Sequence, residues 1–307
     1  MWQAQISFQY ADTNDFYVGD QSVEHPWPGG PALYGTPPAR REAIYAIDVF
    51  YGVSNRLSLD LTLPFLSGYS QVVQGSPASH QLYQWHTGGF GDMAIQAEYW
   101  LNDPTKVSRL QGSVDVGIKM PTGADDLTGP GPNGTMPLDE ATQLGNGGWA
   151  VLLRAQGTMQ LGGPFALYGS GYYGLSLTEH SDVPQGGKLP NGALAFRGVP
   201  DTYSGRLGGA YFLPFFEGLV FTAGGRINGV TVRDVIGGGD LSFRRPGYEV
   251  YFEPGLSWTL GRNVASLSVP IRIYQKQLNS LLDQAQGMVR GSDFVPYLVV
   301  ASFARRF

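Results

Sequence analysis

The sequence predicts an all-β fold: a transmembrane antiparallel up-and-down β-barrel of about twelve strands, with residues 1–307 forming one domain. Three observations lead to this prediction. Apolar and polar residues alternate in many segments, the connections between these segments are short and long by turns, and an apolar segment, Val295–Phe307, ends in an aromatic residue. Outer-membrane barrels share these properties, because their strands face lipid on one side and the last strand closes the barrel against the first.

The composition supports a membrane location and narrows the classes of function. Charged residues make up 15% of the chain, whereas about 25% is usual for soluble domains. No stretch approaches the ~18 apolar residues that a transmembrane helix needs, so only a closed barrel could span a membrane. The net charge is −5 and the basic residues are scattered, so no nucleic-acid partner is expected. The absence of Cys excludes disulfides, thiol catalysis and cysteine-ligated zinc.

The alternation is clearest in residues 57–63, where leucines interleave with Ser58, Asp60 and Thr62. One face of such a strand is apolar and the other is polar. In a membrane barrel the apolar face contacts lipid and the polar face lines the lumen. The predicted strands are 3–11, 41–52, 57–66, 90–101, 108–119, 148–161, 165–176, 201–212, 219–232, 245–259, 265–275 and 293–306.

The lengths of the connections favour a barrel over a soluble sandwich. Short connections (53–56, 102–107, 162–164, 213–218 and 260–264) alternate strictly with long ones (12–40, 67–89, 120–147, 177–200, 233–244 and 276–292). This is the pattern of tight periplasmic turns and long outer loops, with both termini in the periplasm. A sandwich has no reason to place every long loop at one end. An additional short hairpin within Gly19–Ala39 or Leu127–Leu144 would change the strand count by two.

Further features fit export to a bacterial outer membrane. Met1-Trp2-Gln3 does not begin a signal peptide, so we expect the chain to be the mature part of an exported protein. Four tryptophans lie near predicted strand ends, as an aromatic girdle at the membrane surface requires. They are Trp2, Trp100, Trp149 and Trp258. We expect a lumen about 10 Å wide, which suits one small solute.

Four short motifs carry a resemblance to a known family. They are Tyr51-Gly52-Val53-Ser54-Asn55-Arg56-Leu57, Gly89-Phe90-Gly91-Asp92, Gly117-Ile118-Lys119-Met120-Pro121-Thr122-Gly123 and Glu253-Pro254-Gly255. In order and spacing they resemble the outer-membrane family of meta-pathway phenol degradation transporters, a group within the porin-like superfamily. The resemblance implies passive uptake of hydrophobic or aromatic compounds without a cofactor.

Two positions depart from a regular barrel. Pro254 lies inside a predicted strand, where a barrel has no free edge to accept it, so we expect a bulge at this point. Arg305 stands two residues before Phe307, at a position where outer-membrane barrels usually place a hydrophobic residue.

The alternation directs a set of charged side chains toward the lumen. We predict that they line the solute path and form a polar track; alternatively, they pair across the lumen and fill it. The predicted lumen residues are Asp48, Asp60, Asp92, Glu98, Asp115, Lys119, Arg154, Arg206, Arg226, Glu249, Glu253 and Arg272. Both signs of charge are present, so no cation or anion preference follows. On the same face, Tyr168, Tyr172 and Tyr251 either contact an aromatic or sugar solute or simply occupy space.

No motif indicates an enzyme, a metal site or a cofactor. The four histidines, at positions 25, 80, 86 and 180, all fall in predicted loops, and no G-x-S-x-G motif is present. Gly169–Gly174 matches G-x-G-x-x-G but lies inside a strand with no helix after it, which excludes a dinucleotide site. Asp125-Asp126, Asp139-Glu140 and the pair His80 and His86 are the candidate cation ligands, without the spacing of a known metal motif.

The long loops leave two functions open. Their Gly- and Pro-rich segments, Pro26–Pro31, Gly129–Gly134 and Gly186-Gly187, are mobile surface loops by default, and could instead fold inward as a gate or bind a partner. We expect an outer-membrane channel for small solutes, in contact with lipid. The alternative is a non-conducting barrel whose loops bind a protein partner or assemble into a larger complex. Outer-membrane lipases make a hydrolase the third possibility, which no Ser–His arrangement in the predicted strands favours.

Overall fold

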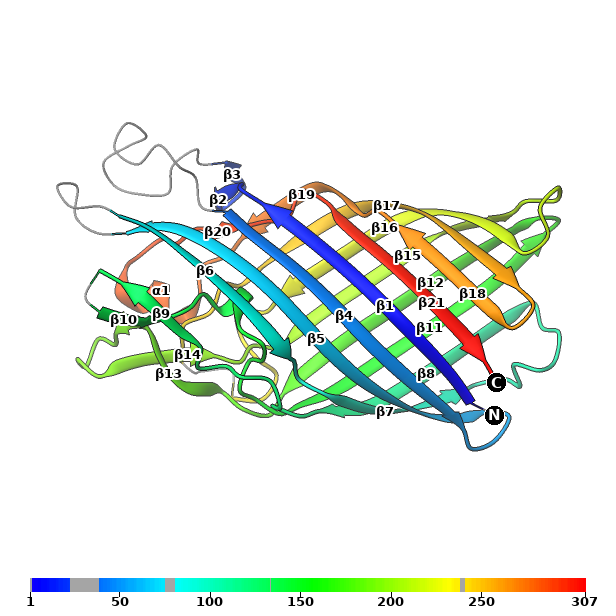
Figure 1. Ribbon diagram of the computed structural model, residues 1–307, viewed down its shortest axis with the longest axis horizontal. Coiled ribbons are helices and arrows are strands. Elements are labelled where there is room, and N and C mark those ends of the chain that lie inside the picture. The colour runs from blue at the N-terminus through cyan, green and yellow to red at the C-terminus, as the bar shows by residue number, and fades with distance from the viewer. Residues whose placement is uncertain (1, 23–38, 75–80, 133, 238–240) are drawn as a thin grey trace.

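The computed structural model (Figure 1) describes residues 2–22, 39–74, 81–132, 134–237 and 241–307. These residues form a closed antiparallel barrel of twelve membrane-length strands, as predicted. Ten strands are continuous: β1 (Trp2–Thr13), β4 (Ala39–Gly52), β5 (Leu57–Gln74), β8 (Leu110–Lys119), β11 (Ala150–Gly162), β12 (Phe165–Ser176), β15 (Thr202–Phe212), β16 (Leu219–Val230), β17 (Gly247–Leu260) and β21 (Leu298–Arg306). The other two are interrupted: β6 (Gln81–Phe90) with β7 (Ala94–Trp100), and β18 (Asn263–Ser268) with β19 (Ile271–Gln277).

Pairing of the first and last strands closes the barrel. In register, Gln3 of β1 lies opposite Arg306 of β21, and the ladder continues to Ala11 opposite Leu298. Phe307 donates its backbone N–H to the Trp2 carbonyl at 2.8 Å. Arg305 therefore does not prevent closure, and both termini lie at the end of the barrel that carries the tight turns, here called the short-turn end (Figure 1).

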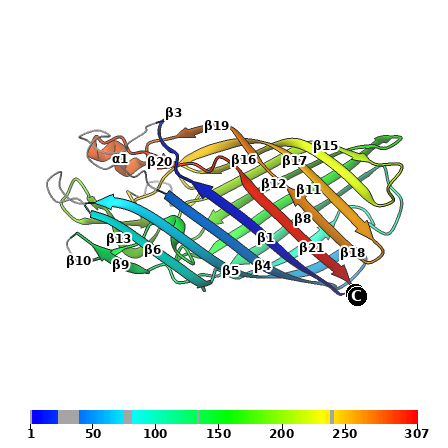
Figure 2. The same ribbon diagram turned by 45° about the horizontal axis from the view of Figure 1, so that its top comes forward.

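The opposite end, here called the long-loop end, carries the remaining elements (Figures 1 and 2). They are β2 (Phe16–Val18), β3 (Gln21–Ser22), β9 (Thr128–Gly131), β10 (Gly134–Pro137), a 3₁₀-helix (Glu140–Thr142), β13 (His180–Lys188), β14 (Leu194–Gly198), α1 (Leu281–Gln286) and β20 (Ser292–Asp293). The hairpin β9–β10 lies within Leu127–Leu144, one of the two segments in which the sequence allows an additional hairpin. It is a separate two-stranded sheet, so it does not change the strand count.

The pattern of burial is the reverse of that in a soluble protein. Along β8, Val116 is 56% exposed on the outer face, whereas Ser113 and Asp115 are each 1% exposed on the inner face. The same alternation places Ile6, Ile47, Leu59 and Ile95 on the outside. A barrel that exposes apolar side chains and encloses polar ones is suited to a lipid environment. No helix in the described ranges is long and apolar enough to cross a membrane.

Several predicted boundaries were wrong. Strand β7 begins at Ala94 rather than at residue 90, and β21 begins at Leu298 rather than at residue 293. Two further differences are larger. Residues 67–74 and 81–89 were expected to form a loop, but β5 and β6 continue as paired strands through them, with Gln74 opposite Gln81. The hydrophobic alternation is weak there, because polar residues such as Ser67, Gln71 and Gln84 stand where an alternating strand would carry apolar ones. The predicted strand 265–275 is interrupted at Val269-Pro270.

The interruption beside Pro254 explains how β17 accommodates this residue. Pro254 lies in register with Ala223 of β16 without a bulge at that point. On its other side the neighbouring strand is broken, and the Val269 N–H donates to the Pro254 carbonyl at 3.0 Å. The register shift of β17 against β19 occurs between Val250 and Tyr251. The expected bulge is therefore close to Pro254 but not at it.

Candidate functional site

The inner face of the barrel holds its charged residues in separate groups. The first group contains Asp48 of β4, Asp60 of β5, Glu98 of β7 and Asp115 of β8, and is called the carboxylate wall below. Asp48 accepts hydrogen bonds from Thr62 Oγ1 at 2.8 Å and from Gln5 Nε2 at 3.4 Å. Glu98 accepts from Ser58, Ser113 and Gln156, and Asp115 pairs with Arg154 of β11. Among these four carboxylates, Asp115 is the one that forms an ion pair with a guanidinium, that of Arg154.

The second group is an arginine pair that shares one carboxylate. Arg206 of β15 and Arg226 of β16 are direct cross-strand partners. Arg206 holds Glu253 of β17 in a bidentate contact, with distances of 3.0 and 2.7 Å, and Arg226 lies 3.4 Å from the same carboxylate. The Arg206 guanidinium also lies over the Tyr168 ring at 6.0 Å. This group therefore contains two guanidinium groups and one carboxylate.

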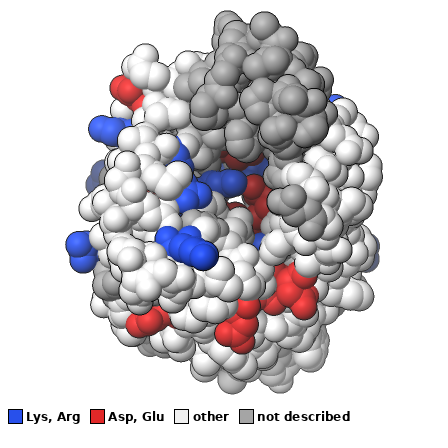
Figure 3. Space-filling view, turned by 90° about the vertical axis from the view of Figure 1, so that its left-hand side faces the viewer, with Lys and Arg blue, Asp and Glu red and all other residues white. Residues whose placement is uncertain are grey.

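The other four predicted lumen residues hold loops in place. Lys119 contacts Asp92 at 2.7 Å, and Asp92 also accepts from the backbone of Gly123 and Asn146. Arg272 pairs with Asp15 at 2.9 Å, and Glu249 accepts from the Val295 backbone at 3.0 Å. These contacts fix the segments after β1, after β8 and before β21. Figure 3 looks into the long-loop end and shows basic and acidic side chains on opposite sides of the opening.

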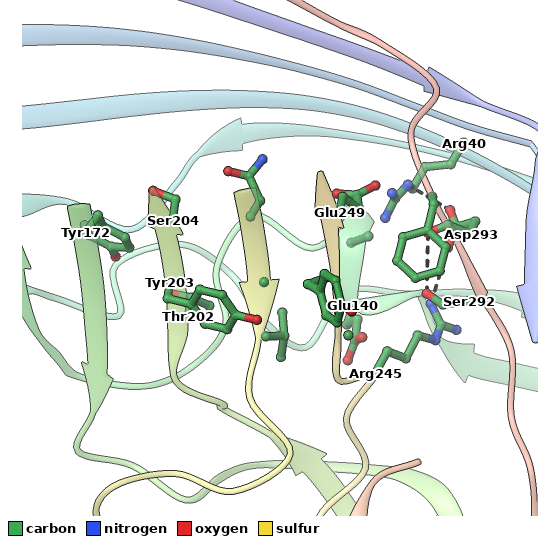
Figure 4. A pocket seen from close by; sticks show the side chains of 17 residues that line it. Arg40, Glu140, Tyr172, Thr202, Tyr203, Ser204, Arg245, Glu249, Ser292 and Asp293 are labelled. Atoms are coloured by element: carbon green, nitrogen blue, oxygen red, sulfur yellow. Dashed lines mark hydrogen bonds and ion pairs between the residues drawn. The ribbon is translucent and has the colours of Figure 1, made fainter. Parts of the chain in front are cut away.

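A cavity of about 440 Å³ lies inside the barrel near the long-loop end (Figure 4). Four lining residues form a row of cross-strand partners on adjacent strands: Tyr172 opposite Ser204, Ser204 opposite Asn228, and Asn228 opposite Glu249. This polar row comes from the strand alternation. Tyr172 was among the tyrosines predicted to face the lumen, whereas Tyr251 is buried and Tyr168 packs with Arg206.

An ionic cluster borders the cavity on its loop side and is called the mouth cluster. Arg245 lies 2.8 Å from Asp139 and 3.9 Å from Asp293, and Arg40 of β4 lies 3.0 Å from Asp293. Glu140 lines the cavity beside them. These residues come from β4, from the loop between β8 and β11, from the segment before β17 and from β20. The mouth cluster therefore joins four parts of the chain that are distant in sequence.

The electrostatic environment affects the two neighbouring carboxyls of the mouth cluster in opposite directions. Burial raises the pKa of Glu140 above its ordinary value, and Arg245 only partly offsets this effect. Burial acts in the same direction on Asp139, but the Arg245 guanidinium outweighs it and lowers the pKa of that carboxyl. Asp139 is therefore a stable anion that holds Arg245.

The loop between β8 and β11 folds inward, and Arg197 of β14 holds it there. The Arg197 side chain is fully buried; it donates to the Leu138 carbonyl at 2.9 Å, to Gln185 Oε1 at 2.7 Å and to the Asp125 carbonyl. A buried guanidinium needs such partners, because an unpaired one costs several kcal/mol. The part of this loop around Leu138 and Glu140 is therefore docked at the mouth, and the prediction that Gly129–Gly134 is a mobile surface loop stays a prediction.

The candidate metal ligands do not come together. Asp139 is occupied by Arg245, and His180 stacks on Phe196 at 5.2 Å. His86 packs against Tyr69 at 4.9 Å, while His25, His80 and Pro26–Pro31 lie outside the described residues. Within the described ranges, no group of three or more His, Asp or Glu side chains could hold a metal ion.

Sequence reasoning missed most of the mouth cluster. Arg40 falls at the edge of a predicted strand, and Asp293 and Arg245 also lie near strand ends, where alternation gives no orientation. Asp139 and Glu140 were considered only as cation ligands. The available signal was the number of charged residues that the long loops place near strand ends, which indicates pairing but not the partners.

Comparisons with known proteins show the fold. No family model and no curated protein matches this chain. An outer-membrane channel from Pseudomonas putida F1 is similar in structure over 100% of this chain and 95% of its own, with a TM-score of 0.62 and 15% identity. A deletion mutant of the monoaromatic hydrocarbon channel TodX matches over 100% and 90%, with a TM-score of 0.50 and 9% identity. The chain therefore has the fold of outer-membrane channels. Its resemblance to the phenol degradation transporters is not confirmed at the level of that family.

Proposed function

We propose that this protein is an outer-membrane channel for the passive uptake of small hydrophobic or aromatic solutes. The observation that carries the proposal is the cavity of about 440 Å³ inside a barrel whose outer face is apolar. A cavity of this size accommodates one small aromatic molecule. The channel fold of the solved neighbours supports the same function, and no chemical step or cofactor is needed for it.

The path runs from the long-loop end through the cavity and then between the carboxylate wall and the arginine pair to the short-turn end. In this arrangement the long loops face outward and both termini lie in the periplasm. The mouth cluster and the docked loop between β8 and β11 form the constriction, because they border the cavity on its outer side. The polar residues further down the barrel replace part of the hydration of a passing solute.

Filling the cavity provides the test. Ser204 lies on the inner face of β15 in the polar row, so Ser204→Trp places a large ring in the cavity. We expect the uptake of a radiolabelled aromatic compound into proteoliposomes to fall by about tenfold, since a narrow path has no alternative route. Leu207→Trp is the matched control, because Leu207 lies on the same strand and is 70% exposed on the outer face. Equal uptake by both variants would contradict the proposed path.

A further inference from the structure

We propose that the carboxylate wall binds a small monovalent cation and gives the lumen a preference for cations over anions. This goes beyond the uptake of hydrophobic solutes and does not depend on it. The sequence alone predicted no preference for cations or anions, because strand alternation places both acidic and basic residues on the lumen face. The structure distributes these charges unevenly around the barrel, and the unevenness carries the inference.

The strand register makes the wall continuous. Asp48 lies opposite Thr62, which places it diagonally next to Asp60, two residues away on β5. Glu98 lies opposite Ser58, so it is the diagonal neighbour of Asp60 on the other side. Glu98 and Asp115 are direct partners across β7 and β8. Direct partners on one face of a sheet are about 5 Å apart and diagonal ones about 7 Å. The four carboxylates therefore follow one another across four adjacent strands.

Cationic partners are too few to neutralise this wall. Asp115 contacts Arg154, whereas the hydrogen-bond donors to Asp48 and Glu98 are neutral: Thr62 and Gln5 for the former, Ser58, Ser113 and Gln156 for the latter. The arginine pair is bound to Glu253. Like charges this close repel unless a proton or a counterion reduces the repulsion. A bound cation provides that counterion.

Asp60 marks the place where the cation binds. Its side chain lies at the centre of the wall and is only 6% exposed. Its Oδ1 atom is buried and has no hydrogen-bond partner in the described part of the chain, and the same is true of Asp115 Oδ1. A buried carboxylate oxygen without a donor is costly, so native structures rarely retain one without an ion or water beside it. Two such oxygens belong to this one wall.

The spacing selects the kind of cation. Calcium and magnesium need several oxygens within about 2.5 Å of the ion. No set of three acidic or His groups among the described residues is arranged in this way. Carboxylates spread over four strands suit a monovalent alkali or ammonium ion that keeps part of its hydration shell and can move on. The wall is therefore a step on an ion path rather than a chelating site.

Rubidium provides a direct test of binding. Crystals of the full chain grown in rubidium chloride should show an anomalous scattering peak beside Asp60 Oδ1, and crystals of Asp60→Asn should lack it. Glu217→Gln is the matched control, since Glu217 is an exposed carboxylate in a short turn and its loss should leave the peak unchanged. The absence of a peak in the unmodified protein, or a peak that persists in Asp60→Asn, would overturn the proposal. This measurement tests cation binding even if the protein does not conduct ions.

Ion selectivity provides the second readout. In a planar bilayer with a potassium chloride gradient, the reversal potential should show that potassium is more permeant than chloride. Asp60→Asn should lower the permeability ratio by about twofold, because one of the wall's charges is lost, and Glu217→Gln should not. A chloride preference would mean that the arginine pair dominates the lumen, and would contradict the inference. Aromatic uptake is measured separately, so failure of the proposed function is distinguishable from failure of this site.

Discussion

Arg245 makes two of the three ion pairs described for the mouth cluster. Its guanidinium joins Asp139 of the docked loop to Asp293 of β20, at 2.8 and 3.9 Å. Arg245→Met keeps the length of the side chain but removes both ion pairs, and should weaken docking by about 2 kcal/mol or more, since Asp139 loses its ion-pair partner whereas Asp293 keeps Arg40. Hydrogen exchange at Glu140–Thr142 should become faster. Arg56→Met, at an exposed turn position, is the control, and unchanged exchange in Arg245→Met would show that the cluster does not hold the loop.

The pH dependence of docking follows from Asp139 and Glu140, the two acidic residues that the docked loop contributes to the mouth cluster. Asp139 has a lowered pKa because of Arg245, so its contribution persists above the ordinary value of 3.8 and is lost only as the pH falls through the lowered pKa. Glu140 has a pKa raised by burial, so its contribution is present at low pH and lost as the pH rises through the raised value. Acidification from about pH 7 to about pH 5 should therefore leave the loop docked or tighten it. The test is hydrogen exchange at Glu140–Thr142, corrected for its intrinsic pH dependence. Faster corrected exchange between about pH 7 and about pH 5 would show that the loop is released and would contradict this prediction.

At the scale of single elements, the extended β5–β6 hairpin packs against the β9–β10 hairpin. Trp85 of β6 is buried and donates its indole N–H to the Pro130 carbonyl of β9 at 3.2 Å. A Cβ atom at Gly129 would lie 2.3 Å from the Trp85 ring. Gly129 is therefore required for the close approach of the two hairpins.

Gly129→Ala should displace Trp85 and expose its ring to water. The expected result is a red shift in tryptophan fluorescence that disappears in a Trp85→Phe background. Gly171→Ala is the matched control, because a Cβ there meets nothing within 4 Å. An unchanged spectrum in Gly129→Ala would mean that the hairpins do not pack as described.

The elements also show what alternation can and cannot predict. Residues 57–63 alternate strictly, and the structure places Leu59 outside and Asp60 inside, as expected. The boundaries at 67–89 and at Val269-Pro270 were wrong, since the ladder there depends on partner strands rather than on the alternation of the segment itself. The mouth cluster depends on the conformation of the loops, which the periodicity of apolar and polar residues does not predict. The placement of side chains along the strands was thus predictable, and their pairing was not.

At the scale of the whole molecule, the barrel has different features in its different parts. The outer face is apolar, and the lumen carries the carboxylate wall and the arginine pair on different strands. The long-loop end holds the cavity and the mouth cluster. Because the ion pairs occupy many of the lumen charges, the interior is partly filled, as small barrels often are. A narrow and selective path is therefore expected rather than a wide pore.

Single-channel recording of the refolded protein in a planar bilayer tests the central claim most directly. A solute path through the lumen predicts discrete openings of small conductance, and a small aromatic compound added on the side of the long loops should reduce the current as it occupies the cavity. Ser204→Trp should lower the conductance and remove this block, while Leu207→Trp should behave like the unmodified protein. A correctly inserted barrel that stays silent, or one whose current is unaffected by every aromatic compound, would contradict the account.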